Sequence, residues 1–359
     1  MQFYQPFASP ARSKSSSIKI SDEERIIGSQ SPRSTTMLSE LAETSYTILN
    51  DSSNGVLNAQ NKVFECTTDM GLKPTQEDRI ILAPEFFDQE LALCAVFDGT
   101  SGDAASNFSS KYLPNFLCNT QEMQSLLTFC KFRKQFNIPP GKEMEFVARL
   151  SSAALRKAFL NMDQVLLHHL KEESLHFTAC TTVSALVWKN MLTIAHLGDS
   201  RACIYRTNED GSLHPEWLTV DHKPNNPEEQ QRINAQGGSL SWTHGKPYLR
   251  GPDFLERYNK GEHPKKLNFS RGFGGKDLKP YGFSADPDIK HFEITSNDKF
   301  VVLATDGLWD VLSANYIGHL IAISQAKGLS ATDELVKAAL EEMPDATIRD
   351  NISVIVISL

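Results

Sequence analysis

The sequence lacks a long apolar segment. No run of about 18 apolar residues, the length that spans a bilayer, occurs in the 359 residues, so we expect no transmembrane helix. Residues 1–20 lack the apolar centre of a secretory signal, and Gln2 replaces the glycine that N-myristoylation requires. We therefore expect a protein without membrane attachment.

Cysteine is scarce and irregularly spaced. The six cysteines show neither CxxC nor CxxH spacing, which argues against a zinc site and against a disulfide scaffold. Cys94 and Cys203 lie within apolar runs, where a free thiol usually acts as a small core residue. These features favour a reducing compartment, so we expect a cytoplasmic protein, with the nucleus as the other compartment that fits.

Basic residues are not in excess. The formal net charge is −8 and the pI is near 5.7, whereas a nucleic-acid binder usually carries a basic field. We therefore expect no nucleic-acid partner. The proportions of hydrophobic residues (40%) and charged residues (22%) are those of an ordinary soluble globular protein.

Two regions of the chain differ in composition. Residues 1–55 are rich in Ser and Thr, which predicts a largely irregular extension. Between residues 60 and 359, β-rich runs and helical patterns follow one another without a linker, which predicts one domain. The apolar runs 179–188 and 191–197 are typical of a β-hairpin. Such pairs favour antiparallel sheets with helices outside, not a doubly wound parallel sheet.

Acidic residues follow or flank apolar strands at five places in the chain. They are Glu77-Asp78, Asp98, Asp199, Asp306 with Asp310, and Asp350. Turn chemistry is sufficient to explain any single one, because Asp is favoured in turns beside Gly. Neighbouring strands would nevertheless bring all five to a common edge, where like charges repel unless cations lie between them.

The acids predict a particular kind of metal. Ligand sets made only of oxygen are typical of Mg²⁺ or Mn²⁺ rather than zinc. Gly99, directly after Asp98, lets the backbone carbonyl approach as a further oxygen ligand. Two such ions, about 3.5–4 Å apart, would activate a water molecule for in-line attack on phosphorus.

These segments resemble, in the same order, those of the metal-dependent protein phosphatases, the type 2C Ser/Thr phosphatases. The resemblance runs from Val63 to Leu359 and is specific in both the residues of the motifs and the order of the motifs. It rests on GLKPTQED, AVFDGTSGD, ACTTVSALV, AHLGDSRACIY, LTVDHKPNNPEEQQRINAQGG, LNFSRGFG, ATDGLWDVLS and RDNISVIV.

The resemblance implies an α+β fold. In it a central β-sandwich of two antiparallel sheets is flanked by helices on both sides, giving four layers in the order α-β-β-α. The resemblance also implies that Asp98 bridges two metal ions, that Glu77 and the carbonyl of Gly99 complete one site, and that Asp306 and Asp350 hold the other.

Further positions acquire roles by the same resemblance. Asp199 and Asp310 match acids that the family links to a weaker, third metal ion. Asp78 matches an acid that hydrogen-bonds metal-bound water. Residues 239–266 match the family's mobile flap beside the substrate groove, and this segment is enlarged here.

Three positions depart from the family's pattern. Lys73 replaces an Arg that binds phosphate bidentately, and Lys binds only as a point charge; as a solvated loop residue it would have no role. Thr100 replaces a His that acts as general acid, a contribution of about 10²–10⁴-fold. Metal-bound water, or His244 on the flap, is a candidate substitute. Gly275 replaces an Asp, for which Asp277 is the candidate substitute.

Three functions remain open at this point. The first is an active phosphatase that hydrolyses phosphoserine and phosphothreonine in proteins with Mg²⁺ or Mn²⁺, and a monomer is the default expectation for it. The second is a catalytically weak or silent relative that acts as a scaffold, which the three departures favour. Retention of every metal acid favours the enzyme. A metal-dependent nuclease fits poorly, because no basic groove is evident.

Overall fold

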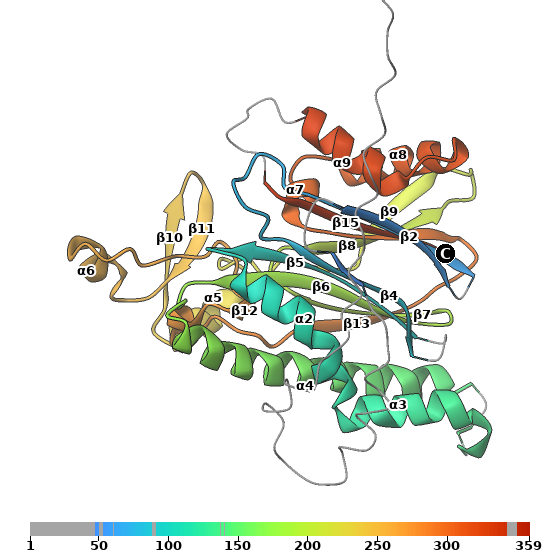
Figure 1. Ribbon diagram of the computed structural model, residues 1–359, viewed down its shortest axis with the longest axis horizontal. Helices are drawn as coiled ribbons and strands as arrows, with labels where there is room; N and C mark the ends of the chain where they lie inside the picture. The colour runs from blue at the N-terminus through green and yellow to red at the C-terminus, as the bar shows by residue number, and fades with distance from the viewer. Residues whose placement is uncertain are drawn as a thin grey trace, which may run out of the picture.

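The computed structural model describes residues 47–49, 53–59, 61–87, 91–136, 138–139, 141–342 and 350–359. Two antiparallel sheets lie face to face, and helices cover the outer face of each (Figure 1). The predicted α+β fold with its α-β-β-α layers is therefore confirmed. Within the described residues, no helix has both the length and the apolarity needed to cross a bilayer.

Each sheet has a continuous strand order. The first runs β1 (Thr47–Leu49), β4 (Arg79–Phe87), β5 (Leu91–Thr100), β6 (Ala179–Trp188), β7 (Met191–Leu197) and β13 (Asp288–Glu293), with β12 (Phe273–Gly274) also pairing with β6. The second runs β2 (Ser53–Ala59), β3 (Lys62–Asp69), β15 (Ile352–Ser358), β14 (Asp298–Ala304), β8 (Arg201–Thr207) and β9 (Leu213–Trp217).

The helices divide between the two outer faces (Figure 1). The first sheet is covered by α2 (Ala104–Cys118), α3 (Gln121–Phe132) and α4 (Glu143–Glu172). The second is covered by α7 (Asp306–Trp309), α8 (Ala314–Ala326) and α9 (Ala331–Glu342). The central strands are therefore buried on both faces, which explains why β6, β7, β14 and β15 read as nearly continuous apolar runs.

Strand alternation shows how β5 serves two cores at once. Its odd-numbered residues pack among α2 and α4, and its even-numbered residues pack against the other sheet: Leu91, Leu93, Ala95 and Phe97 on the first side, and Ala92, Cys94 and Val96 on the second. Asp98 continues the even-numbered series. The carboxylate is therefore carried on the inter-sheet side of a strand that is anchored from both faces.

The sheets begin earlier in the chain than the composition predicts. The prediction assigned residues 1–55 to an irregular extension and began the domain at residue 60. Thr47–Leu49 and Ser53–Ala59 are instead strands, which pair with β4 and β3. Polar residues in β2, an edge strand, hide its strand character. The rest of the proposed extension lies outside the described residues.

A separate hairpin projects from the sandwich (Figure 1). It consists of β10 (Ser239–Thr243) and β11 (Lys246–Arg250), followed by α6 (Phe254–Asn259). These elements occupy the segment that the sequence assigned to the flap. A small apolar cluster at its base includes Ile233 of α5 (Pro227–Ala235) with Leu249 and Leu267.

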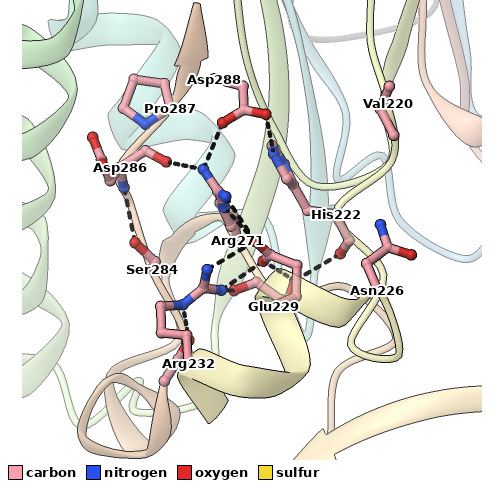
Figure 2. Close-up of polar contacts among 12 residues, drawn as sticks. Val220, His222, Asn226, Glu229, Arg232, Arg271, Ser284, Asp286, Pro287 and Asp288 are labelled. Carbon is pink, nitrogen blue, oxygen red and sulfur yellow. Dashed lines mark hydrogen bonds and ion pairs between the residues drawn. The ribbon is translucent and has the colours of Figure 1, made fainter. Parts of the chain in front are cut away.

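A buried ion network fixes α5 beside β13 (Figure 2). Glu229 of α5 accepts hydrogen bonds from Arg232 and from Arg271, whose Nη2 lies 2.7 Å from Oε1. Arg271 also donates to Asp288 of β13, at 2.8 Å. Burial opposes ionisation of Glu229, but the hydrogen bonds from Arg232, Arg271 and Ser270 hold its pKa at about 2. The ionised carboxylate of Glu229 therefore stabilises the folded state.

The network predicts a specific acid sensitivity. Because the folded pKa is lowered, ionised Glu229 stabilises the fold above the ordinary value of 4.5, and this contribution is lost as pH falls towards 2. At pH 7, Glu229→Gln should lower the free energy of unfolding by about 3–5 kcal/mol, because Arg271 loses a buried partner. Urea unfolding should show this deficit shrinking with acidification; a deficit independent of pH would contradict the account.

Candidate metal centre

Strand register brings the predicted acids to one end of the sandwich. Ala304, the last residue of β14, pairs with Arg201 on one side and with Val354 on the other. Asp306 lies two residues after Ala304, and Asp199 lies two residues before Arg201. In the other sheet, Asp98 lies near the end of β5, opposite Thr181. Residues that are far apart in sequence therefore project from neighbouring strand ends.

The carboxylates of Asp98, Asp199 and Asp306 converge. One oxygen of each lies within 4.8 Å of the others. Desolvation, and then the charge of Asp306, raise the pKa of Asp98 well above its ordinary value. Desolvation and the charge of Asp199 do the same to the pKa of Asp306. A cluster of oxygen donors whose charges repel one another fits a hard divalent cation, so the residues present suit Mg²⁺ or Mn²⁺.

Asp78 and Glu77 lie beside this cluster in different environments. Asp78 is buried and accepts a hydrogen bond from Thr305 Oγ1 at 3.0 Å. Desolvation raises the pKa of Asp78 to about 7, although hydrogen bonds from Ser353 and Thr305 oppose the shift. The backbone N–H of Glu77 donates to Asn351 Oδ1 at 2.9 Å, which fixes Glu77 against the loop before β15.

Gly99 is required by close packing at the same place. A Cβ atom at this position would lie 2.4 Å from the carbonyl oxygen of Glu77 and 2.9 Å from Ser106 Oγ. No side chain fits there without moving the backbone of Glu77. The Asp98-Gly99 pair thus keeps the end of β5 in contact with the loop that carries Glu77 and Asp78.

Several acids of the centre have internal cationic partners. Lys223 Nζ pairs with Asp199, and Lys73 Nζ lies 3.0 Å from Asp350 Oδ1. Partial burial opposes protonation of Lys73, but Asp350, followed by Asp98 and Glu77, raises its pKa. The ammonium group of Lys73 is therefore held beside the acid cluster, and it is not an unattached loop residue.

Asp310 lies at the rim of the centre and faces two cations. Arg201 Nη2 is 3.5 Å from its Oδ1, and Lys246 Nζ of the hairpin is 3.8 Å from its Oδ2. Sequence reasoning assigned no role to Arg201 or Lys223. Both lie inside the quoted segments AHLGDSRACIY and LTVDHKP. Their partners are distant in the chain, with a separation of 24 residues between Lys223 and Asp199 and of 109 between Arg201 and Asp310, so these contacts had no local sequence signal.

Two departures from the family pattern, Thr100 and Gly275, lie at different places in the structure. Thr100 is the last residue of β5, two residues beyond Asp98 and on the same side of the strand. Gly275 has a left-handed backbone (φ 59°), and a Cβ there would lie 2.7 Å from the Phe283 ring. Asp277 forms an ion pair with Arg257 of α6 at 3.1 Å. It therefore holds the flap helix instead of substituting in the centre.

His196, His222 and Asp288 form a second group with metal-ligand residue types. The rings of His196 and His222 stack with their centroids 4.5 Å apart. Gly198 N–H donates to Nδ1 of His222, so the neutral ring carries its proton on Nε2, which faces Asp288 at 3.4 Å (Figure 2). A protonated nitrogen offers no lone pair to a metal. This arrangement is therefore an imidazole–carboxylate pair.

Comparison with known proteins agrees with this geometry. The family model for protein phosphatase 2C matches residues 66–346. The chain is 32% identical to probable protein phosphatase 2C 61 of Arabidopsis thaliana, over 80% of this chain and 82% of the relative. It is 28% identical to protein phosphatase 2C 1 of Paramecium tetraurelia, over 81% and 87%.

A solved structure gives the same result. The serine-threonine phosphatase 2C of Toxoplasma gondii superposes with a TM-score of 0.79 at 32% identity, covering 87% of this chain and 98% of that one. The chain belongs to the protein phosphatase 2C family. It is a metal-dependent protein serine/threonine phosphatase, and its substrates are phosphoproteins.

Charge crowding in the centre predicts an unusual effect on stability. Removing one carboxylate charge by Asp306→Asn should raise the melting temperature of the metal-free protein at pH 8 by about 2–4 °C, the equivalent of about 1 kcal/mol. The same variant should lose most of the stabilisation that Mn²⁺ gives the wild type.

Thermal unfolding in EDTA and in Mn²⁺ checks both expectations. Asp277→Asn is the matched control, because it removes the same charge from an ion pair with Arg257, outside the cluster. A melting temperature of metal-free Asp306→Asn at or below that of the wild type would argue against mutual repulsion.

Proposed function

We propose that this phosphatase hydrolyses phosphoserine and phosphothreonine at two Mg²⁺ or Mn²⁺ ions. Asp98 would lie between the ions, Glu77 and the Gly99 carbonyl would hold one, and Asp306 and Asp350 would hold the other. The convergence of the Asp98, Asp199 and Asp306 oxygens within 4.8 Å is the observation that carries the proposal. The raised pKa values of Asp98 and Asp306 support a centre whose carboxylates are stabilised by bound cations.

The chemistry divides between the ions and the chain. The ions, when bound, supply positive charge to the phosphoryl oxygens and activate a water molecule for attack on phosphorus. Asp78, with a pKa of about 7 and a hydrogen bond from Thr305, is suited to hold or accept a proton near the attacking water. Lys73 would contact the phosphoryl group as a point charge. Thr100 cannot act as a general acid, so departure of the alkoxide lacks the usual donor.

A third, weaker metal position would use Asp199 and Asp310. Lys223 and Arg201, which contact these acids, keep the local charge partly neutral when the position is empty. We further propose a monomer in the cytoplasm, with the nucleus as the alternative compartment. Five cysteines, namely Cys66, Cys94, Cys118, Cys180 and Cys203, are buried and form no disulfide among the described residues, which supports a reducing compartment.

Loss of the bridging acid tests the centre. Asp98→Ala should lower Mn²⁺-dependent hydrolysis of p-nitrophenyl phosphate by about 10²–10³-fold or more, because the metal charge at the phosphoryl group is lost. Asp277→Asn should retain activity within about twofold, since Asp277 lies outside the acid cluster and its hydrogen bond with Arg257 can be kept by Asn. Undiminished turnover by folded Asp98→Ala would remove the basis of the proposal.

Thr100 provides a test of the leaving-group step. Thr100→His should accelerate hydrolysis of a phosphoserine peptide by about tenfold or more, since general acid catalysis contributes about 10²–10⁴-fold. The gain on p-nitrophenyl phosphate should be smaller, because an acidic phenol leaves without a proton. The ratio of kcat values on the two substrates is the measurement. Equal gains, or a larger gain on the aryl ester, would exclude a missing general acid.

The departures at Lys73, Thr100 and Gly275 keep a silent scaffold as the second candidate. Turnover of a phosphothreonine peptide in Mn²⁺ against EDTA separates the two candidates directly. Metal-dependent release of phosphate supports the enzyme. No release in either condition, from a protein that binds Mn²⁺, supports the scaffold.

A further inference from the structure

The β10–β11 hairpin presents one chemically distinct face. In its antiparallel register, Ser239 lies opposite Arg250, Ser241 opposite Tyr248, and Thr243 opposite Lys246. Paired residues share a face, and alternate residues along a strand share it too, so these six side chains lie on one side. We call this side the basic face. The opposite side carries Leu240 and Leu249, which pack into the apolar cluster at the hairpin base.

A third cation joins this face from the segment after α6. Lys266 Nζ hydrogen-bonds to Thr243 Oγ1 and lies over the ring of Tyr248, 4.5 Å from its centroid. Arg250 Nε donates to Ser239 Oγ at 3.2 Å. The face thus combines Lys246, Arg250 and Lys266 with one aromatic ring, and none of its six register positions carries an acid.

Two of the three cations on this face lack an ion pair among the described residues, and one hydroxyl lacks a hydrogen-bond partner there. Among the described residues, neither Arg250 nor Lys266 forms an ion pair. Ser241 Oγ is buried and has no hydrogen-bond partner there. A buried hydroxyl without a partner loses its solvation free energy unless a ligand replaces the water. Two unpaired cations beside such a hydroxyl are the donors that an anion requires.

The basic face lies next to the catalytic centre. Lys246 Nζ is 3.8 Å from Asp310 Oδ2, so the hairpin turn reaches the rim where a phosphorylated residue would enter. The whole protein is acidic, with a formal net charge of −8. A negatively charged substrate segment is therefore repelled by most of the molecule and attracted at this face.

We propose that the basic face binds Asp and Glu side chains that flank the phosphorylated residue, and so selects acidic phosphoprotein segments. This inference rests on the proposed function, because it names a substrate class for the same site. The carboxylates would contact Arg250 and Lys266, and the Ser241 hydroxyl would donate to an acceptor of the bound segment. Tyr248 supplies the apolar surface between them.

Matched peptides test the preference. Three phosphothreonine peptides of equal length carry flanking runs of Asp, of Ser or of Lys. At low salt the wild type should hydrolyse the Asp peptide with a kcat/KM about tenfold above that for the Ser peptide, mainly through a lower KM. The kcat/KM for the Lys peptide should be below that for the Ser peptide. The preference should shrink as salt rises towards 0.5 M, since exposed charges are screened.

Charge reversal locates the preference. Lys266→Glu should lower the Asp-to-Ser ratio of kcat/KM about tenfold, and Arg250→Gln about threefold. Lys260→Glu is the control, because it makes the same charge change on α6, where Lys260 pairs with Glu256 instead of joining the face. It should alter the ratio less than about twofold. If Lys266→Glu does not fold, the Asp-to-Ser ratio of Arg250→Gln still tests the role of the basic face.

The outcomes separate the two hypotheses. Mn²⁺-dependent hydrolysis of all peptides without preference for Asp would overturn this inference and leave the proposed function intact. An equal loss of the ratio in Lys260→Glu would also overturn it, because general charge and not the basic face would be responsible. No hydrolysis of any peptide or of p-nitrophenyl phosphate would overturn both.

Discussion

Mutual repulsion between carboxylates is the constraint on which this structure depends. Asp98, Asp199 and Asp306 are brought within 4.8 Å by strand ends from both sheets, against their electrostatic preference to separate. The sandwich can hold them because each strand is anchored by apolar packing on both of its faces. Lys223 offsets part of the repulsion internally. The remaining repulsion suits the site to divalent cations, which would supply the charge that phosphoester hydrolysis needs under the proposed function.

Much of this arrangement could be predicted from the sequence. Hairpin-like pairs of apolar runs indicated antiparallel sheets with helices outside, and the family resemblance implied that the sheets form a sandwich. Strands β6 and β7 pair as the predicted hairpin around Lys189-Asn190. The positions of the acids after apolar strands indicated the cluster. Edge strands β1 and β2 were missed, because strand pairing at an edge depends on a neighbour and not on apolar alternation. Contacts between charged side chains, such as Lys223 with Asp199, depend on three-dimensional packing that no local pattern encodes.

The departures from the family pattern leave the acid cluster untouched. Gly275 adopts a backbone conformation that an Asp would adopt only with strain, and the Phe283 ring fills the space beside it. Asp163 of α4 accepts a hydrogen bond from Gly274 N–H and pairs with Lys279, so this turn is fixed by other residues. Lys73 keeps a positive charge beside the acids. Only Thr100 removes a chemical capacity, that of a proton donor for the leaving group.

The account makes one claim about position that diffraction can test directly. Crystals soaked in Mn²⁺ and measured at the manganese absorption edge would locate the ions by anomalous scattering. We predict two peaks about 3.5–4 Å apart, flanking Asp98 and adjacent to Asp306. An empty acid cluster, or manganese bound instead between His196, His222 and Asp288, would contradict the account.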